Sequence, residues 1–478
     1  MPSKTINELP EKLELEAGDN VVATDNSGAP TTKKVTGSNL AKGLVTIIAG
    51  SSALLAILAA ALIPYLPATS DVTVCAVGCK YTTDGTADNI EIQSALNYVH
   101  LKNGGSVFIK SGTYDILNNL TIYDNTELKG ETGTILKRAY SNVSGSMIKN
   151  ELYSGGIIGN FNIKIHDITW DDSIEGMTFN QFLHAISFFG TDNVSIYNNT
   201  FKNLNGDGIY LSSGSNFSPG MLPARNTRIF GNFFDGSNVN RQAISLIDTS
   251  STSIFGNVFN RMATTTMPSA IDLEPNTSTQ RIINTTITGN TFYGNRIGIQ
   301  SYNLFFANVT GLAISGNVFD HSVLNDIFIY QTNLVSITGN THYGSGRRAY
   351  EIGGSSTVTI SGNQIFYTVS SGMYLYNNGD GITITGNGVF SPAGHGIWFE
   401  NTNNAVVTGN TIRNWGTAST TYNAVYGEVS STRVNVVGNT FTDSIGGHTC
   451  VESVDTSSGW QSIGNMFVGC STDTNMIP

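Results

Sequence analysis

A short pattern of apolar and polar positions recurs eleven times between residue 199 and the C-terminal part of the chain. Each copy alternates apolar and polar residues and then carries Gly-Asn, often followed by an aromatic residue, as in SIFGNVF around Asn257. Intervals of 23 to 33 residues separate the asparagines, which are Asn199, Asn232, Asn257, Asn290, Asn317, Asn340, Asn363, Asn387, Asn410, Asn439 and Asn465. Intervals of this size are typical of stacked structural repeats, so the pattern predicts a stack of similar units.

Each copy is predicted to be a short β-strand with one buried face, because its apolar residues recur with a period of two. A second short strand follows in most repeats, as in GIYL at 208–211 and AIDL at 270–273, and no helical pattern of useful length separates them. Two or three strands per turn of about two dozen residues indicate an all-β protein, a right-handed parallel β-helix of about eleven or more coils. A propeller is disfavoured, because each of its blades takes about 40 residues.

The Gly-Asn pairs are interpreted as structural. Equivalent positions of such a stack lie about 4.8 Å apart, so the pairs form a column. Glycine allows the positive φ of a tight bend, and stacked asparagine amides can hydrogen-bond to one another and to the backbone of the turn. The first copy has Asn198 in place of the glycine. We therefore predict an asparagine ladder that holds the coils together.

The composition fits such a fold and narrows the class of partner. Of the 478 residues, 40% are hydrophobic and 12% are charged, and the formal net charge is -11. An acidic chain without a visible basic stripe is not expected to bind nucleic acid, whereas a surface rich in Asn, Ser, Thr and Tyr suits neutral or weakly charged glycans. The cysteines fall in two pairs, Cys75 with Cys79 and Cys450 with Cys470, and their spacing does not decide whether they form disulfides.

The alternation also sorts the second strand of each repeat into inward and outward positions. We place Ile209, Ile244, Ile271 and Ile299 inward, so that their neighbours point outward. The first outward column is then Tyr210, Ser245, Asp272, Gln300, Phe328, Glu351, Tyr374, Trp398 and Tyr426. The second outward column, two residues further along each strand, is Ser212, Ile247, Glu274, Tyr302, Tyr330, Gly353, Tyr376, Glu400 and Glu428. The two columns combine carboxylates with a file of exposed aromatic residues.

This mixture of side chains has two interpretations. Aromatic faces pack against the apolar faces of sugar rings while carboxylates and amides bind the hydroxyl groups, so a long groove can hold several sugars in line. Alternatively, the aromatic residues cover the sheet or a subunit interface, where they are also enriched. The file as a whole favours a glycan groove.

Asp272 and Glu274, in the phrase AIDLEPN, are the first candidates for catalysis. They are two residues apart on one strand, so both point outward, with Cα atoms roughly 6.5 to 7 Å apart. Glycoside hydrolysis uses two carboxyl groups about 5 to 9.5 Å apart, one protonated as general acid and the other acting as base or nucleophile. The spacing fits both retaining and inverting geometry. Simple solvation of a surface strand is the competing explanation for two such acids.

Neighbouring repeats supply further candidates, of which Asp248 is a third candidate catalytic acid. The phrases NRQAISLID and SAIDLEPN are similar to a phrase that recurs in polysaccharide-active β-helix proteins, and this resemblance favours Asp272 and Glu274 over the other acids. The candidate substrate-binding residues are Asp207, Arg241, Gln242, Gln300, Tyr302, Tyr330, Glu351, Tyr374, Tyr376, Trp398 and Glu400.

A second cluster competes with this site. Glu400 and Glu428 fall in one column one coil apart, near His395 and Trp398, with Glu351 two coils back. The cluster is either an alternative catalytic site or a distant subsite of the same groove. His395 by itself is more often a packed or surface histidine than a base.

Hydrolysis is favoured over β-elimination. Elimination from uronates usually uses a lysine or arginine base, often beside calcium, and the chain has no lysine after Lys202, although arginines remain. No cluster has the ligand spacing of a zinc site or an EF-hand. We therefore expect neither a metal nor another cofactor.

The N-terminal part of the chain differs in character. Residues 1–43 read as short strands and turns, too few to bury much of a core. Residues 44–66 form an apolar run long enough to span a bilayer, and it begins too late for an ordinary signal peptide. One interpretation is a membrane anchor with the neighbouring lysines on the cytoplasmic side, and the other is a helix that symmetry mates bury in an oligomer.

A resemblance bears on this choice. The phrases INELPE and AGDNVVATDNSGAPTTKKVTGSNL resemble the head of bacteriophage tail spikes and tail fibres. In that family the head attaches a homotrimeric spike to the virion. The resemblance implies that residues 1–43 bind other virion tail proteins, and that residues 44–67 are an apolar helical connector rather than a membrane span.

A second resemblance concerns residues 81–116, YTTDGTADNIEIQSALNYVHLKNGGSVFIKSGTYDI, which are similar to the entry region of the pectate-lyase-like superfamily. There a short amphipathic helix, here carrying Ile92, Ala95 and Leu96, caps the N-terminal end of the β-helix and shields its open edge. The resemblance implies an entry and capping region over 68–130 and the β-helix proper over 131–478.

These observations together predict a bacteriophage tail spike of the virion tail that binds and hydrolyses host surface polysaccharide, as an endo-glycosidase of capsule or O-antigen. The alternative from another class is a receptor-binding spike without enzymatic activity. A polysaccharide lyase and a membrane-anchored glycan-binding protein of a cell surface are the remaining alternatives.

Overall fold

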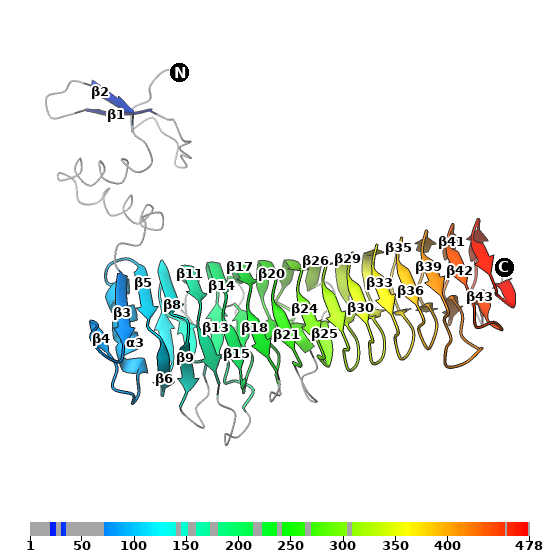
Figure 1. Ribbon diagram of the computed structural model, residues 1–478. Coiled ribbons are helices and arrows are strands. Elements are labelled where there is room, and N and C mark those ends of the chain that lie inside the picture. The colour runs from blue at the N-terminus through cyan, green and yellow to red at the C-terminus, as the bar shows by residue number, and fades with distance from the viewer. Residues whose placement is uncertain are drawn as a thin grey trace. The chain divides into compact units, whose positions relative to one another are not determined.

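The period-two alternation of the sequence produces three parallel sheets that wind around one core, as Figure 1 shows for this computed structural model. The structure describes residues 71–139, 145–151, 159–172, 180–213, 222–236, 241–262, 269–303, 308–454 and 457–476, and the backbone of 20–24 and 30–34. From residue 105 onward each coil contributes one strand to each sheet, and neighbouring strands of a sheet come from successive coils. The predicted parallel β-helix is therefore confirmed.

We name the sheets I, II and III in the order in which the chain enters them. Sheet I has 16 strands, β4 (Tyr81–Thr82), β3 (Asp71–Cys75), β5 (Gly105–Ile109), β8 (Thr126–Gly130), β11 (Phe161–His166), β14 (Asp192–Tyr197), β17 (Ala224–Phe230), β20 (Thr249–Phe255), β23 (Ile282–Thr288), β26 (Val309–Ser315), β29 (Thr332–Thr338), β32 (Ser356–Ser361), β35 (Ile382–Thr385), β38 (Ala405–Thr408), β41 (Asn435–Val437) and β44 (Gln461–Ile463).

Sheets II and III have 14 strands each. Sheet II consists of β6 (Gly112–Ile116), β9 (Thr134–Arg138), β12 (Thr169–Asp171), β15 (Thr200–Lys202), β18 (Phe233–Asp235), β21 (Val258–Asn260), β24 (Thr291–Tyr293), β27 (Val318–Asp320), β30 (Thr341–Tyr343), β33 (Gln364–Phe366), β36 (Gly388–Phe390), β39 (Thr411–Arg413), β42 (Thr440–Thr442) and β45 (Met466–Val468). Sheet III consists of β7 (Leu120–Ile122), β10 (Ile148–Asn150), β13 (Ile186–Phe189), β16 (Ile209–Ser212), β19 (Ile244–Leu246), β22 (Ser269–Leu273), β25 (Ile297–Tyr302), β28 (Ile327–Tyr330), β31 (Tyr350–Gly353), β34 (Met373–Tyr376), β37 (Ile397–Glu400), β40 (Val425–Glu428), β43 (Thr449–Ser453) and β46 (Thr472–Asn475).

The inward positions form columns of like side chains. On sheet III, Ile209, Ile244, Ile271 and Ile299 are fully buried, as predicted from the alternation. On sheet II the aromatic residue after each Gly-Asn stacks on that of the next coil, with ring centroids 4.6 to 5.0 Å apart from Phe201 through Phe319. Stacking at the pitch of the coils makes this part of the core continuous from Phe201 to Phe319.

The predicted asparagine ladder is present in the turn between sheets I and II. Asn290 Nδ2 donates to Asn317 Oδ1 at 3.0 Å and to the carbonyl of Ile254 at 2.9 Å, and its backbone N–H donates to the same Asn317 Oδ1 at 2.9 Å. The same donor and acceptor pattern repeats in every coil from Asn199 to Asn465. The preceding residue has positive φ throughout, and Asn198, which replaces glycine in the first copy, adopts φ 54°.

A single helix of the described chain, α3 (Asn89–His100), caps the first coil. Its apolar face buries Ile92, Ala95, Leu96 and Val99 against the core, as the resemblance implies. Its polar side chains also bind the open sheet edge, since Gln93 accepts from the N–H of Thr121 at 2.7 Å and donates to its carbonyl at 3.1 Å. This pairing occupies groups that would otherwise be free to pair with another strand.

The chain separates into two compact units, residues 1–68 and 69–478. In the first, β1 (Asn20–Thr24) pairs antiparallel with β2 (Pro30–Lys34). The apolar run 44–66, for which we weighed a connector against a membrane span, lies outside the described residues, and no helix in the described part is long and apolar enough to cross a membrane. In the second unit, both cysteine pairs left open above are disulfide-bonded.

Candidate functional site

The outward face of sheet III carries the two predicted columns. The strand register pairs Tyr210 with Ser245 and continues in the same column through Asp272, Gln300, Phe328, Glu351, Tyr374 and Trp398 to Tyr426. The second column is in register from Tyr302 to Glu428. Its first members, Ser212 and Ile247, are buried rather than exposed.

Asp272 lies in β22 and is the most enclosed carboxylate of these columns. Its side chain is only 2% exposed, which differs from the solvent-facing position that alternation predicts. Gln242, one coil earlier, donates from Nε2 to Asp272 Oδ2 at 2.9 Å, while Oδ1 is buried and accepts no hydrogen bond within the described part of the chain. Glu274 follows at the end of β22, where its backbone N–H pairs with the carbonyl of Leu246 at 2.9 Å, and its side chain is half-buried.

Burial raises the pKa of Asp272 from its ordinary 3.8 to about 8, and the negative charge of Glu274 contributes in the same direction. Burial also raises the pKa of Glu274, against the opposing effect of the Arg241 guanidinium. At neutral pH Asp272 is therefore protonated and can donate a proton. Two neighbouring carboxyl groups with unequal environments are the arrangement that separates an acid from a base.

Asp207, one of the candidate binding residues, forms a buried ion pair beside these two acids. Arg241 Nε and Nη2 both lie 2.9 Å from Asp207 Oδ1. His184 lies 3.4 Å from Oδ2 through Nδ1, but this nitrogen accepts the backbone N–H of Asp207 at 3.0 Å, and burial lowers the pKa of His184 to about 4. The histidine is therefore neutral, and Arg241 supplies the positive charge that balances Asp207.

The coils around Asp272 also contain many buried polar atoms that lack a hydrogen-bond partner within the described part of the chain. They are Asn205 Nδ2, Asp207 Oδ2, Ser212 Oγ, Arg241 Nη1, Gln242 Oε1, Ser245 Oγ, Ser269 Oγ and Asp272 Oδ1. A buried polar atom without a partner costs free energy, so such a concentration is typical of a site that binds a polar ligand or water.

Asp248, the third predicted catalytic acid, does not join this cluster. It lies in the turn from sheet III to sheet I, where its Oδ1 accepts the backbone N–H of Arg281 at 3.0 Å. Burial raises the pKa of Asp248, and the hydrogen bond from Ser213 opposes that shift. Because its carboxylate bonds the backbone of this turn, we assign Asp248 to the turn rather than to catalysis.

The aromatic residues of the face form a stacked file. Ring centroids lie 5.6 Å apart for Tyr302 and Tyr330, 6.3 Å for Tyr330 and Tyr376, 5.0 Å for Tyr376 and Tyr374, and 4.3 Å for Tyr374 and Trp398. The sequence analysis predicted that these residues offer their faces to sugars, whereas in the structure most of the faces lie against one another. Their edges and polar atoms are what a ligand lying along the stack would contact.

Gly353 explains how one of these contacts bridges two coils. A Cβ at Gly353 would lie 2.2 Å from Cζ of Tyr376, so the tyrosine ring occupies the place of the missing side chain. This position lets Tyr376 reach Tyr330 across the intervening coil.

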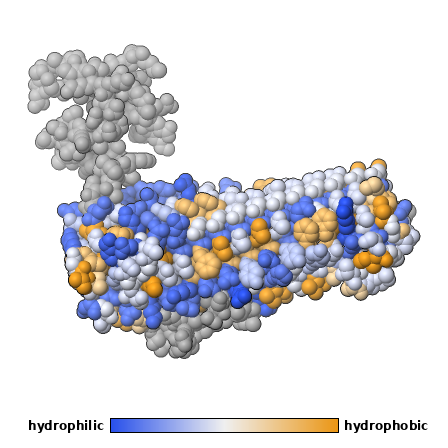
Figure 2. Space-filling view, viewed as in Figure 1, coloured by the Kyte–Doolittle hydropathy of each residue, from blue (hydrophilic) through white to orange (hydrophobic). Residues whose placement is uncertain are grey.

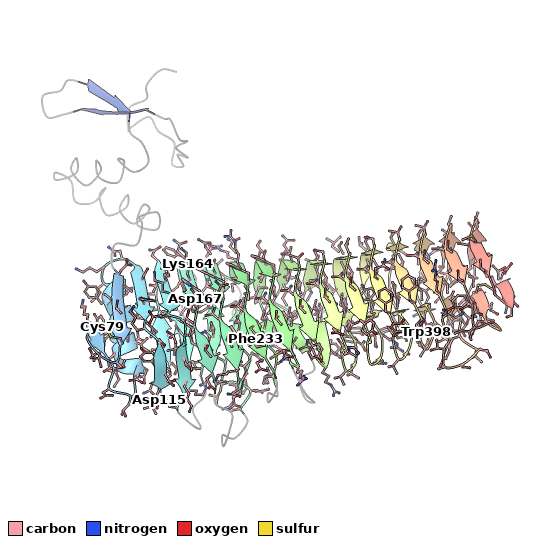
Figure 3. All side chains as sticks on the ribbon, in the orientation of Figure 1. Cys79, Asp115, Lys164, Asp167, Phe233 and Trp398 are labelled. Atoms are coloured by element: carbon pink, nitrogen blue, oxygen red, sulfur yellow. A yellow bond between two sulfur atoms is a disulfide. The ribbon has the colours of Figure 1, made fainter. Side chains whose placement is uncertain are left out.

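The second predicted cluster is an internally bonded network further along sheet III, and Figure 3 marks its residue Trp398 toward the C-terminal end of the β-helix. Glu351 is nearly buried and lies 2.9 Å from Arg348 Nη1 and 3.1 Å from Arg347 Nη1. Tyr374 donates its hydroxyl hydrogen to Glu400, and Trp398 Nε1 donates to Glu428 at 3.1 Å.

His395, in the same cluster, stacks on Tyr426 at 4.3 Å. Its Nδ1 accepts the backbone N–H of Asn423 at 3.0 Å, and burial lowers its pKa to about 3. His395 is therefore neutral, and Glu351, Glu400 and Glu428 each already accept a hydrogen bond within the network. The network is better suited to binding hydroxyl groups through its carboxylates than to acid catalysis.

A further set of polar residues beside the outward columns was not predicted from the sequence. These side chains lie three positions before the first outward column, at the edge where the loop enters sheet III, and they are His184, Asn325, Arg348 and Asn423. Asn325 donates to Glu351 at 2.7 Å and Asn423 to Glu452 at 3.0 Å. A polar residue recurs at this position in several repeats, including Asp207 and Gln242. This recurrence could have identified the four residues from the sequence.

No group of three or more His, Cys, Asp or Glu side chains in the described ranges is arranged to hold a metal ion. The Asp272 cluster already has an arginine as its cation, and the second cluster has two. The arrangement therefore offers proton transfer and hydrogen bonding, both of which glycan chemistry uses.

Comparison with known proteins agrees with the fold. A family model described as a right-handed β-helix region matches residues 302–467. The pre-mature gene product 12 of bacteriophage phi29 superimposes with a TM-score of 0.57 at 15% identity, covering 80% of this chain and 55% of that chain. The tailspike protein of E. coli bacteriophage HK620, solved as a mutant in complex with a hexasaccharide, gives 0.56 at 14% identity, with 79% and 74% covered.

The surface adhesin PfbA of Streptococcus pneumoniae gives a TM-score of 0.51 at 15% identity, with 80% of this chain and 90% of that chain covered. No curated protein matches the chain. The protein is a parallel β-helix. At these identities the likeness concerns the fold alone, which enzymes and non-enzymatic proteins share.

Proposed function

We propose that the protein binds a polysaccharide on the outward face of sheet III and hydrolyses it at Asp272 and Glu274. The observation that carries the proposal is the enclosed Asp272, held by Gln242 on one oxygen, without a partner on the other in the described structure, and with a pKa of about 8. A carboxyl group that stays protonated at neutral pH beside a second carboxyl group is what glycoside hydrolysis requires.

The roles follow from the two environments. Asp272 donates its proton to the glycosidic oxygen as the bond between that oxygen and the anomeric carbon breaks. Glu274, which is less enclosed, either takes a proton from the attacking water or attacks the anomeric carbon itself. In both cases one water is consumed and one new reducing end forms. Arg241 binds Asp207 through Nε and Nη2 and holds this neighbouring carboxyl group in place beside the two acids.

The surface favours a polysaccharide without strong negative charge. Glu274, Glu400 and Glu452 lie on the face of sheet III, and the arginines next to it are already paired with Asp207 and Glu351. A polyanionic glycan would meet like charge there, whereas a neutral glycan would donate its hydroxyl hydrogens to the carboxylates. The net charge of -11 acts in the same direction.

The biological setting is part of the proposal. The resemblance of residues 1–43 to the head of phage tail spikes supports a homotrimeric spike that attaches to other tail proteins of a virion and acts on the surface of its host. The hexasaccharide in the HK620 tailspike crystal supports a glycan as ligand. Recovery of the protein in a membrane pellet, with its loss on deletion of residues 44–66, would contradict the virion setting.

A second candidate function is glycan binding without cleavage. The observation that favours it is the 2% exposure of Asp272, which leaves little room for a glycosidic oxygen to approach its carboxyl group. The fold is also shared with an adhesin. In this case the same face would act as a receptor-binding surface.

An assay of reducing ends separates these candidates. Purified surface polysaccharides from a panel of bacteria are incubated with the wild type, with Asp272→Asn, and with the control Asp320→Asn, whose acid lies on sheet II. Cleavage by the wild type and the control, with about a hundredfold loss or more in Asp272→Asn, supports hydrolysis. Binding without release from any polysaccharide supports the second candidate, and an ultraviolet-absorbing unsaturated product would identify a lyase.

A further inference from the structure

Tyr302 ends the aromatic file on the side of the carboxyl groups. Its ring partners in the described structure are Tyr330 at 5.6 Å and Phe328 at 6.2 Å, and both belong to the next coil toward the C-terminus. The side chain is 39% exposed, whereas Tyr330 and Tyr376 are half-buried. Among the described residues, no other ring covers the face of the Tyr302 ring that points toward the N-terminal end of the stack.

The strand register shows which residues lie next to this face of the ring. Leu273 pairs with Ser301, so the next residues of the two strands, Glu274 and Tyr302, are neighbours across one coil step of about 4.8 Å. In the first column, Asp272 pairs with Gln300 in the same way. The open face of Tyr302 and the amide of Gln300 therefore border the two carboxyl groups on one side.

Tyr302 is the first ring of the file among the described residues. Tyr374 also follows an acid in register, Glu351, but the Arg348 guanidinium carbon lies 4.1 Å from the centroid of its ring. Tyr330 lies between Tyr302 and Tyr376, and Tyr374 lies between Tyr376 and Trp398. Figure 2 shows apolar side chains in separate patches within a largely polar surface, so no continuous apolar belt on the visible face competes as a platform for sugars.

We propose that Tyr302 is the substrate-binding residue that stacks against the sugar ring at the cleavage point, which rests on the proposed hydrolysis at Asp272 and Glu274. The ligand class is a hexopyranose with one face of C–H bonds, which packs on the open face of the tyrosine. Stacking fixes the ring in front of Glu274, while Gln300 is placed to bond a hydroxyl group of the same sugar.

The orientation of the rings determines the direction in which a bound glycan runs. Tyr302 and Tyr330 are tilted by 23° and succeed one another along the stack, so their planes lie across the axis of the β-helix. A sugar stacked on Tyr302 lies across that axis too. The polysaccharide therefore crosses sheet III at this coil, and the remainder of the aromatic file meets the ligand only with its edges.

The test compares Tyr302→Ala, Tyr302→Phe and the control Tyr293→Ala. Tyr293 is 41% exposed, close to the value for Tyr302, but it lies on sheet II. The dissociation constant for the polysaccharide selected by the reducing-end assay, or by a binding screen of the same panel, is measured in the Asp272→Asn background. KM and kcat are measured with Asp272 intact.

We expect Tyr302→Ala to raise the dissociation constant and KM about tenfold, and Tyr302→Phe to stay within about twofold of the wild type, because the ring and not the hydroxyl group makes the contact. Tyr293→Ala should match the wild type. Tyr302→Ala with unchanged affinity would overturn the inference, as would a Tyr302→Phe variant as weak as Tyr302→Ala. Cleavage by the wild type in those cases would leave the proposed hydrolysis intact.

The converse outcome is also distinct. If no polysaccharide is cleaved but binding is lost in Tyr302→Ala and retained in Tyr302→Phe, the stacking role stands and the proposed hydrolysis fails. The thermal midpoints of all three variants are compared first, so that a folding defect is recognised before affinities are interpreted.

Discussion

The asparagine ladder should strengthen the hydrogen bonding between successive coils, and Asn340→Ala tests this. Asn340 is fully buried in the middle of the stack. Its Oδ1 accepts two hydrogen bonds from Asn317, at 2.9 Å from the backbone N–H and 3.0 Å from Nδ2. Its Nδ2 donates to the carbonyl of Ile314 and to Asn363 Oδ1, both at 3.0 Å. Alanine removes all four hydrogen bonds.

The four bonds are not equivalent. Asn317 Nδ2 keeps its bond to the carbonyl of Ile287, and Asn363 Oδ1 keeps the backbone N–H of residue 340, but the buried N–H of Asn317 loses its acceptor. An orphaned buried donor costs about 1 to 3 kcal/mol, and each other lost bond about 1 kcal/mol. At the lower end of these values, the free energy of opening this coil falls by about 4 kcal/mol.

Amide hydrogen exchange measures this quantity locally. A fall of about 4 kcal/mol corresponds to exchange about a thousandfold faster for the amides of the coils around residues 317–363, with little change in distant coils. The control is Thr341→Ala, because this neighbouring side chain points outward and is exposed. Acceleration of less than about tenfold in Asn340→Ala, or equal acceleration in the control, would refute the reasoning.

Three further predictions concern the face of sheet III. Cleavage should fall as the pH rises through about 8, where Asp272 loses its proton. It should also fall as the pH is lowered to the pKa of Glu274, which lies above its ordinary 4.5, because Glu274 then gains a proton. A pH profile of kcat/KM would show both limits. Because folding raises the pKa of Asp272, its contribution to stability is lost as the pH rises from about 4 to about 8, so Asp272→Asn should melt higher than the wild type at pH 9 and equally near pH 4, measured by calorimetry. Gly353→Ala should displace the ring of Tyr376 and lower stability by about 1 to 3 kcal/mol in denaturant titrations, unlike Gly379→Ala.

The sequence alone allowed the scaffold to be predicted in detail, because the same alternation of apolar and polar residues recurs in each repeat. Period-two alternation placed Ile271 inward and Asp272 outward, and the strand register agrees. His342 occupies the inward position that is aromatic in many other repeats. It stacks on Phe319 at 4.7 Å and forms hydrogen bonds with Asp326 and Tyr350 inside the core.

The site was harder to predict, because alternation gives the direction of a side chain but not what covers it. Asp272 points outward yet is buried, and the loop residue Gln242 that binds it precedes its own strand by two positions. Asp248 was grouped with the two acids because it lies close to them in the sequence repeats. In the structure its carboxylate instead accepts a hydrogen bond from the backbone N–H of Arg281 in the turn. Ring orientation also depends on side-chain torsions, so the covered faces of the aromatic file were not visible in the sequence.

The most direct test of the central claim is cleavage of a bound polysaccharide in water enriched in ¹⁸O. Mass spectrometry of the products should find one ¹⁸O atom in each new reducing end for the wild type and essentially no product for Asp272→Asn. Products of equal yield from Asp272→Asn, or products that carry an unsaturated end and no ¹⁸O, would contradict hydrolysis by Asp272 and Glu274.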